Sequence, residues 1–275
     1  MLLHALDNNG DWISVHQATK GIPYFCPGCK SSLFLRKGIW RKSHFYHSDT
    51  KRICRLQGKT LYHLQAQWAL LNLIGNQEAC VEKRFIEIDR IADLVWDAKK
   101  LVFEIQYSPI TGKEVRQRIA DYQSMGYSVI WIFHDRTFNR KRLTEAEAVV
   151  SGYPHYFTNI DQEGRGGFYD CLTLRQEGIR TWRSKRYPVD LSSPIRIEKF
   201  FDDIPAFLKG RFQLGNIYFR GDLYDQFQGN TKIREFFLKM CDQRSVWIYQ
   251  LKNVFSQILE SYDTLFKVIL EKCCR

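Results

Sequence analysis

The chain has 275 residues, of which 44% are hydrophobic and 15% aromatic, and it carries a formal net charge of +11. These values exclude a disordered chain, and no apolar run approaches the roughly 20 residues of a membrane span. The first residues turn polar at once, unlike a signal peptide, and eight cysteines are few for a disulfide framework. We therefore expect an intracellular protein with reduced thiols, a sizeable core and a polyanionic partner, of which nucleic acid is the commonest.

The N-terminal segment is expected to form a small module that binds zinc. Residues 2–19 are typical of a hairpin with its turn at residues 7–10. Cys26 and Cys29 form a Cys-x2-Cys pair, and fourteen residues separate Cys29 from His44 and His47, so that four side chains suit a structural zinc ion. The histidine spacing is tighter than in common zinc fingers, and Cys54 could replace one histidine. A redox pair and unligated thiols are the alternatives.

Cations alternate with aromatic residues around this array, a combination that suits single-stranded or distorted nucleic acid. A solvated basic face explains the same pattern equally well. The residues concerned are Phe34, Arg36, Lys37, Trp40, Arg41, Lys42, Phe45, Tyr46, Lys51, Arg52 and Arg55.

The middle of the chain is expected to alternate between helices and strands. His63 lies one position beside the apolar stripe of the first helix, and Glu82 lies on the first strand. Thr111 begins the second helix, and a continuous apolar run after it indicates a buried strand. The order is helix, three strands, helix and strand, over residues 60–74, 81–88, 90–107 (a hairpin), 111–125 and 127–133.

The hairpin at residues 90–107 carries the candidate chemistry. A loop symmetric about Ala98 and Lys99 places Asp93 opposite Glu104, with Cβ atoms roughly 5 Å apart. Two like charges on a face with apolar neighbours need compensation, which a hard divalent cation supplies. Gln106 is expected on the same side as Glu104. The alternative is that both acids are ordinary edge-strand residues.

The remainder of the chain offers fewer signals. A helix is expected at residues 143–150, a domain boundary near residues 152–154, and further helices at residues 196–209 and over most of residues 230–272. A segment that combines cations with aromatic residues is a second candidate DNA contact, with a solvated loop as the alternative. Its members are Arg180, Trp182, Arg183, Lys185, Arg186 and Tyr187.

Four segments together resemble the core of PD-(D/E)xK nucleases, and more closely the competence protein CoiA family. They are Arg90-Ile91-Ala92-Asp93, Phe103-Glu104-Ile105-Gln106-Tyr107-Ser108, Arg118-Ile119-Ala120-Asp121-Tyr122 and Val129-Ile130-Trp131-Ile132-Phe133. The resemblance implies an α/β, restriction-endonuclease-like core of order α-β-β-β-α-β. It also implies a zinc-ribbon-like N-terminal module, whereas the apolar periodicity of residues 230–272 predicts a mainly helical C-terminal domain. The expected domains are residues 1–57, 58–150 and 151–275.

The resemblance also implies roles for individual residues. Asp93, Glu104 and the main-chain carbonyl of Ile105 match ligands of Mg²⁺ or Mn²⁺. Glu82 is similar to an additional acid and His63 to a histidine of the first helix, while Gln67 stands where relatives often have lysine. Gln106 occupies the position of the superfamily's lysine, and a carboxamide orients water or phosphate only by hydrogen bonds. The expected contacts to DNA in the core are Arg90, Arg118 and Tyr122.

The function implied is that of a metal-dependent deoxyribonuclease in the bacterial cytoplasm that acts on incoming, single-stranded DNA during natural transformation. A RecA-type recombinase or other competence proteins are the implied partners. The first alternative is a recombination mediator that binds DNA with weak or absent cleavage. The second is an RNA-binding zinc protein, which leaves the paired acids unexplained.

Overall fold

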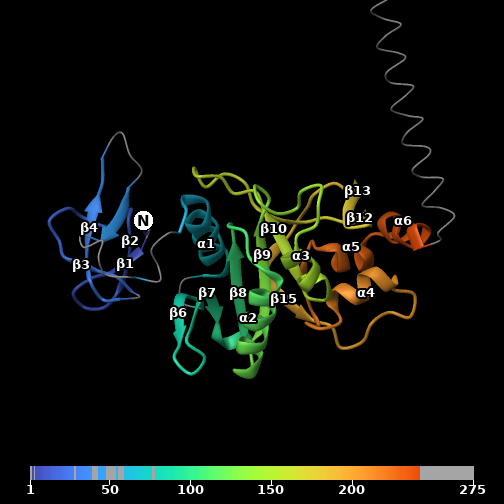
Figure 1. The fold of residues 1–275 in the computed structure, drawn as a ribbon, viewed down its shortest axis with the longest axis horizontal. Helices are drawn as coiled ribbons and strands as arrows, with labels where there is room; N and C mark the ends of the chain where they lie inside the picture. Colours follow the sequence, from blue (N-terminus) through green and yellow to red (C-terminus); the bar gives the residue numbers. More distant parts are fainter. Residues whose placement is uncertain are drawn as a thin grey trace, which may run out of the picture.

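A computed structural model describes residues 2, 4–27, 29–38, 43–47, 54, 59–75 and 78–241 of the chain. The N-terminal module lies at one end, and a larger α/β body follows it (Figure 1). No helix among these residues is long and apolar enough to cross a membrane.

The N-terminal module is a five-stranded antiparallel sheet. Its first hairpin turns at residues 7–10 as expected, because the Asp7 carboxylate accepts hydrogen bonds from the main-chain N–H groups of Asn9 and Asp11. The core of the module also includes Leu64 from the first helix of the α/β body. The sheet order is β2-β1-β3-β4-β5, with β1 His4–Leu6, β2 Trp12–Ser14, β3 Tyr24–Phe25, β4 Ser32–Arg36 and β5 His44–His47.

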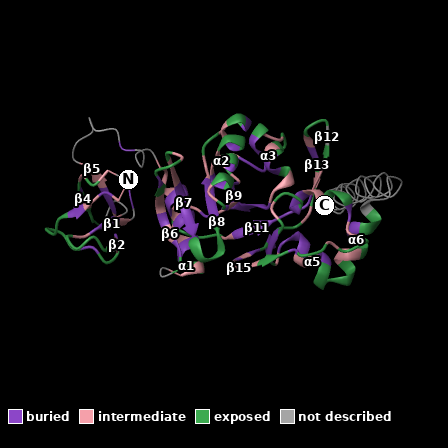
Figure 2. Cartoon of the chain, turned by 90° about the horizontal axis from the view of Figure 1, so that it is seen from below, coloured by how far each residue is buried: buried purple, intermediate pink, exposed green. Residues whose placement is uncertain are grey.

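A seven-stranded mixed sheet forms the centre of the α/β body. Strands β8, β9 and β10 run parallel to one another, and the remaining neighbours pair antiparallel. The buried residues concentrate on these central strands (Figure 2). The order is β14-β11-β10-β9-β8-β7-β6, with β6 Cys80–Phe85, β7 Arg90–Trp96, β8 Leu101–Gln106, β9 Ser128–His134, β10 His155–Thr158, β11 Phe168–Asp170 and β14 Tyr187–Pro188.

Helices cover both faces of this sheet. Helix α1, Leu61–Ile74, packs with Phe103 and Ile105 on one face, whereas α2, Gly112–Ser124, packs with Val102 on the other. Because successive side chains along β8 point to opposite faces of the sheet, this one strand packs against both helices. Thr60 caps α1 and Thr111 caps α2 by accepting a main-chain N–H in the first turn, which confirms the start expected for the second helix.

The hairpin of β7 and β8 has the expected register. Its four-residue loop contains a 3-10 turn, Asp97–Lys99, followed by Lys100 in the left-handed conformation. Leu94 therefore pairs with Phe103, and Trp96 pairs with Leu101. Strand β6 is shorter than expected because residues 86–89 turn the chain into β7.

The expectation of a mainly helical segment after residue 150 is wrong for the described residues 151–241. Strands β10, β11 and β14 extend the central sheet, so the break expected near residue 153 does not end it. The helix expected at residues 196–209 begins only at Ala206, because β15 pairs with β16. The other elements are α3 Glu145–Val149, β12 Thr173–Gln176, β13 Ile179–Arg183, β15 Asp190–Arg196, α4 Ala206–Phe212, β16 Ile217–Arg220, α5 Leu223–Gly229 and α6 Thr231–Cys241. Most of the helix expected at residues 230–272 lies outside the described residues.

Candidate functional site

Three carboxylates lie side by side across three neighbouring strands. Glu82 on β6 stands at the register position of Asp93 on β7, and Asp93 stands at that of Glu104 on β8. Their side chains are buried, with exposed fractions of 6%, 10% and 1%, respectively. Glu82 has a φ of +56° in the middle of its strand, which costs a non-glycine residue about 1 kcal/mol. So many buried acids require cations close by.

Lys59 supplies one of these cations, and the sequence alone did not single it out. Its Nζ donates to Glu82 Oε1 at 2.5 Å and to Asp93 Oδ1 at 2.6 Å. Lys59 directly precedes Thr60, the cap of α1, so the start of the helix directs the amine at the two acids. The only signal in the sequence was its place four residues before His63.

Helix α1 brings two further side chains to the acids. His63 Nε2 lies 3.2 Å from Asp93 Oδ1, and neither this atom nor the buried Glu82 Oε2 makes a hydrogen bond to a described residue. Gln67 donates to Glu82 Oε1 at 2.7 Å and to the main-chain oxygen of Asp93 at 2.6 Å. The spacing of four residues puts His63 and Gln67 on one side of α1, and Lys59, just before the cap, reaches the same acids.

Helix α2 holds Glu104 from the other side of the sheet. Arg118 Nη1 donates to Glu104 Oε2 at 2.7 Å, and the Tyr122 hydroxyl donates to Oε1 at 2.7 Å. Burial and the charge of Asp93 raise the pKa of Glu104 to about 7. Burial also favours a raised pKa for Asp93, but the charges of His63 and Lys59 outweigh it and hold that pKa well below its ordinary value. The two acids are thus held in different protonation ranges.

The residues present fit a hard divalent cation. His63, Glu82 and Asp93 each offer a ligand atom, and these atoms all lie within 4.8 Å of one another. Two of these residues carry buried atoms that make no hydrogen bond to a described residue, His63 Nε2 and Glu82 Oε2. Carboxylate ligands suit Mg²⁺ and Mn²⁺. Glu104 lies outside this group of three, although each oxygen of its carboxylate keeps a lone pair beyond its one hydrogen bond.

The other residues singled out in the core take different positions. Asp93 Oδ2 accepts a hydrogen bond of 2.8 Å from the main-chain N–H of Ile105. Gln106 donates to the main-chain oxygen of Ser108 at 2.6 Å, at the end of β8. Arg90 forms ion pairs with two acids of α2, Glu114 at 2.7 Å and Asp121 at 2.8 Å. Tyr122 is fully buried, so a direct contact with phosphate, as expected from the sequence, is not available to it.

The second candidate DNA contact divides into buried and exposed parts. Arg180 is buried and pairs with Glu147 at 2.5 Å, which corrects its expected role, because this guanidinium stabilises the fold. Trp182 packs against Phe236, with ring centroids 5.8 Å apart. The exposed cations are Arg183, which donates to the main-chain oxygen of Asn139, Lys185, which lies over the Tyr187 ring, and Arg186, which pairs with Asp135 at 3.0 Å.

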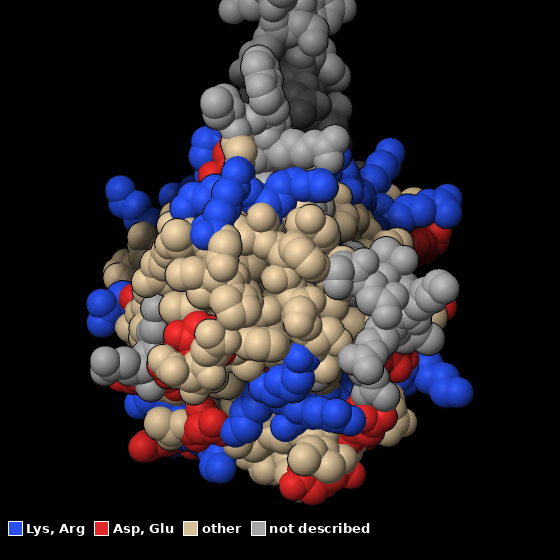
Figure 3. Space-filling model, turned by 90° about the vertical axis from the view of Figure 1, so that its left-hand side faces the viewer, with Lys and Arg blue, Asp and Glu red and all other residues tan. Residues whose placement is uncertain are grey.

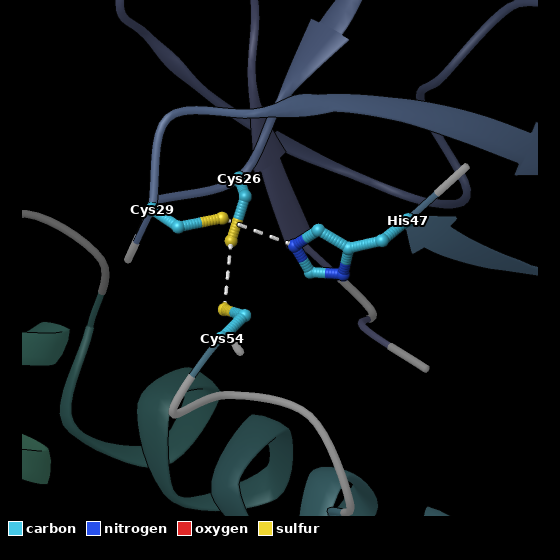
Figure 4. Close-up of side chains that lie close together, drawn as sticks. All are labelled: Cys26, Cys29, His47 and Cys54. Carbon is cyan, nitrogen blue, oxygen red and sulfur yellow. Dashed lines mark hydrogen bonds between the residues drawn. The ribbon is translucent and has the colours of Figure 1, made fainter. Parts of the chain in front are cut away.

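The N-terminal module gathers three cysteines and one histidine (Figure 4). Cys29 Sγ lies 3.2 Å from His47 Nε2, and Cys26 Sγ lies 3.7 Å from Cys54 Sγ. A tetrahedral zinc ion with Zn–S bonds of about 2.3 Å separates two sulfurs by roughly 3.8 Å, so the cluster has the right size. Hydrogen bonds from Ser31 and His47 outweigh burial and lower the pKa of Cys29 to about 6, which favours the thiolate that a metal needs.

His44 is not part of this cluster. It shares β5 with His47, and residues three apart on a strand point to opposite faces. Cys54 takes the fourth position, which is the alternative that the histidine spacing had left open.

The face of the N-terminal module is rich in cations. Lys and Arg side chains gather in two groups there, with uncharged residues between them (Figure 3). Arg36 lies over the Tyr46 ring, 5.0 Å from its centroid, while Phe45 is buried in the core. The exposed, described cations of this module are Lys20, Lys30, Arg36 and Lys37. Trp40, Arg41, Lys42, Lys51, Arg52 and Arg55 lie outside the described residues.

Comparison with protein families gives two matches. Residues 11–57 match the N-terminal domain of competence protein CoiA, and residues 59–161 match its nuclease-like domain. The second match begins at Lys59 and includes the three carboxylates. Searches of curated proteins and of solved structures returned no match.

Proposed function

The chain belongs to the competence protein CoiA family, and on this basis we propose that it is a metal-dependent nuclease that cleaves DNA during natural transformation. The observation that carries the proposal is the buried row of Glu82, Asp93 and Glu104, together with two buried atoms that make no hydrogen bond to a described residue. Buried polar atoms of a fold are usually paired, so two unpaired ones in the cluster of His63, Glu82 and Asp93 support a ligand that is shared between them.

The proposed ligands of Mg²⁺ or Mn²⁺ are Asp93, Glu104 and the main-chain carbonyl of Ile105, joined by Glu82 and His63. The ion supplies a water of lowered pKa and neutralises charge on the phosphate. Arg118 and Tyr122 position Glu104 by their hydrogen bonds to its two oxygens. Arg118 also keeps a side chain that is 28% exposed, so its guanidinium is open to a phosphate beside Glu104.

Lys59 compensates for the glutamine at position 106. A lysine stabilises developing negative charge, which the amide of Gln106 does less well. In this chain the amine reaches the acids from the start of α1 and not from β8. Lys59 is therefore proposed as the cation that faces the scissile phosphate.

A structural zinc ion in the N-terminal module completes the proposal. Cys26, Cys29, His47 and Cys54 are its proposed ligands, because three thiolates and an imidazole form a closed set of four. The exposed cations beside this cluster then offer an electrostatic surface to the DNA backbone.

Cleavage of labelled single- and double-stranded DNA tests the nuclease. The native chain is compared with Asp93→Asn and Glu104→Gln in the presence of Mg²⁺ or Mn²⁺. Glu87→Gln is the matched control, because Glu87 is an exposed acid of the turn between β6 and β7. The proposal predicts that both site variants lose metal-dependent cleavage and that the control keeps it.

A recombination mediator without cleavage is the second candidate function. Gln106 favours it, because this residue lacks the superfamily's amine and directs its amide to Ser108. If the native chain binds DNA and cleaves neither substrate with either metal, the nuclease is refuted and the mediator is favoured.

A further inference from the structure

An aromatic stack includes the neighbour of His63 on α1, and no step of the proposed cleavage uses it. Tyr62 and Tyr107 are stacked with ring centroids 5.1 Å apart and an angle of 10° between the planes. Arg136 lies over the Tyr62 ring, with Cζ 4.6 Å from its centroid, and donates a hydrogen bond to the Tyr62 hydroxyl. The three residues come from α1, from the end of β8 and from the turn after β9.

His134 contacts both rings of this stack and holds them in place. Its ring meets both tyrosines edge-on, at centroid distances of 5.3 Å from Tyr62 and 5.1 Å from Tyr107. One ring nitrogen accepts a hydrogen bond from the main-chain N–H of Arg136, and the other lies 2.8 Å from the main-chain oxygen of Ile160. Because the acceptor nitrogen needs its lone pair for this bond, the second nitrogen is the one that donates to the carbonyl of Ile160. The tyrosines thus stand on a rigid base.

The stack is open to solvent. Tyr62 and Tyr107 are only half-buried, and Arg136 is exposed. Arg140, also exposed, donates to the main-chain oxygen of Arg136 at 2.6 Å, so a second guanidinium lies next to the first. Rings and cations in a rigid, accessible group form the kind of surface on which the bases of single-stranded nucleic acids stack.

The position of the stack links it to the site. Tyr62 directly precedes His63, whose Nε2 lies 3.2 Å from Asp93 Oδ1, and Tyr107 is the first residue after β8, the strand that carries Glu104. A DNA strand that places a phosphate at the acids therefore passes the stack with a neighbouring nucleotide. A paired base cannot stack there, because its faces are already covered within the duplex.

We propose that Tyr62, Tyr107 and Arg136 form a stacking subsite for one unpaired base of the DNA strand that the acid cluster cleaves. The proposal rests on the proposed function and adds the contact by which the site would select an unpaired base, in a single strand or a frayed end. Arg140 contacts the adjoining phosphate.

Binding in EDTA tests the subsite without any cleavage. The native chain is titrated with a fluorescent oligothymidylate and with an abasic oligonucleotide of the same length and charge. Tyr107→Leu and Tyr62→Leu are expected to weaken binding of oligothymidylate about tenfold and to leave binding of the abasic strand unchanged, since one stacked base contributes about this factor. Phe201→Leu is the control, because Phe201 is an aromatic residue with 42% exposure that lies between β15 and α4, outside the proposed DNA contacts.

A second readout guards against a folding defect. Single 2-aminopurine bases in the strand lose fluorescence when they stack, and the native chain should quench one such base more than Tyr107→Leu does. Tyr62→Phe retains the ring and should bind oligothymidylate like the native chain. If the native chain binds both strands equally, or if the leucine variants weaken both equally, the subsite is refuted. A native chain that distinguishes the strands but never cleaves refutes only the nuclease.

Discussion

Replacement of Lys59 by methionine tests the charge balance of the candidate site. The amine makes two short ion pairs, with Glu82 at 2.5 Å and Asp93 at 2.6 Å, and the side chain is only 15% exposed. Methionine fills a similar volume but leaves both carboxylates without this cation. Removal of one partner from a buried ion pair costs about 3–5 kcal/mol, so we expect the free energy of unfolding to fall by this amount in EDTA.

A divalent cation should restore much of this loss. Without the amine, Asp93 and Glu82 offer more negative charge to Mn²⁺, so the variant should bind the ion more tightly than the native chain. Ligand binding to the folded state alone raises the free energy of unfolding with ion concentration. Urea denaturation, followed by circular dichroism with and without Mn²⁺, measures both effects, while cleavage is expected to be lost.

Lys83→Met is the matched control. Lys83 pairs with Asp97 at 2.7 Å, but the two side chains are 33% and 50% exposed. An exposed pair contributes about 0.2–1 kcal/mol, so this variant should remain close to the native chain. If the two lysine variants are equally stable in EDTA, or if Mn²⁺ stabilises both equally, the role assigned to Lys59 is refuted.

Three further predictions concern the neighbouring groups. Tyr122→Phe leaves a buried oxygen of Glu104 without its donor and should lower the free energy of unfolding, measured by urea denaturation, by about 1–3 kcal/mol. An unchanged free energy of unfolding would show that this hydrogen bond does not stabilise the fold. The pKa of Glu104, about 7, lies above its ordinary value of 4.5, so its contribution to stability is present at low pH and is lost as the pH rises through about 7. In EDTA the native chain should therefore lose more stability than Glu104→Gln between about pH 5 and pH 8. The affinity for Mn²⁺, measured by electron paramagnetic resonance, should rise about tenfold between about pH 6 and pH 8 in the native chain but not in Glu104→Gln. Cys54→Ser should lower the zinc content measured by mass spectrometry and His44→Ala should not, and the reverse pattern would restore His44 as the ligand.

The parts of the site that depend on local rules were predictable from the sequence. The register of Asp93 against Glu104 followed from the symmetry of the loop, and the start of α2 followed from the capping residue Thr111. The contacts of Lys59 were not predictable in this way, because its place four residues before His63 does not show how α1 packs against the sheet.

Two other differences have equally physical causes. The spacing of His44 and His47 predicts that both are ligands, but strand geometry separates residues three apart onto opposite faces. After residue 150, strands such as β10 and β11 have only four and three residues, respectively. Apolar runs this short do not distinguish a strand from a piece of helix, so their pairing partners decide the structure.

The parallel pairing of β10 with β9 determines how the protein can be divided for study. A fragment that ends at residue 150 would uncover one edge of β9, a strand with six buried residues in seven, and expose a row of unpaired main-chain groups. A fragment that ends with the family match at residue 161 would transfer the same defect to β10, which normally pairs with β11. Only a fragment that continues through Pro188 keeps all seven strands, so shorter ones are expected to aggregate whatever their catalytic residues.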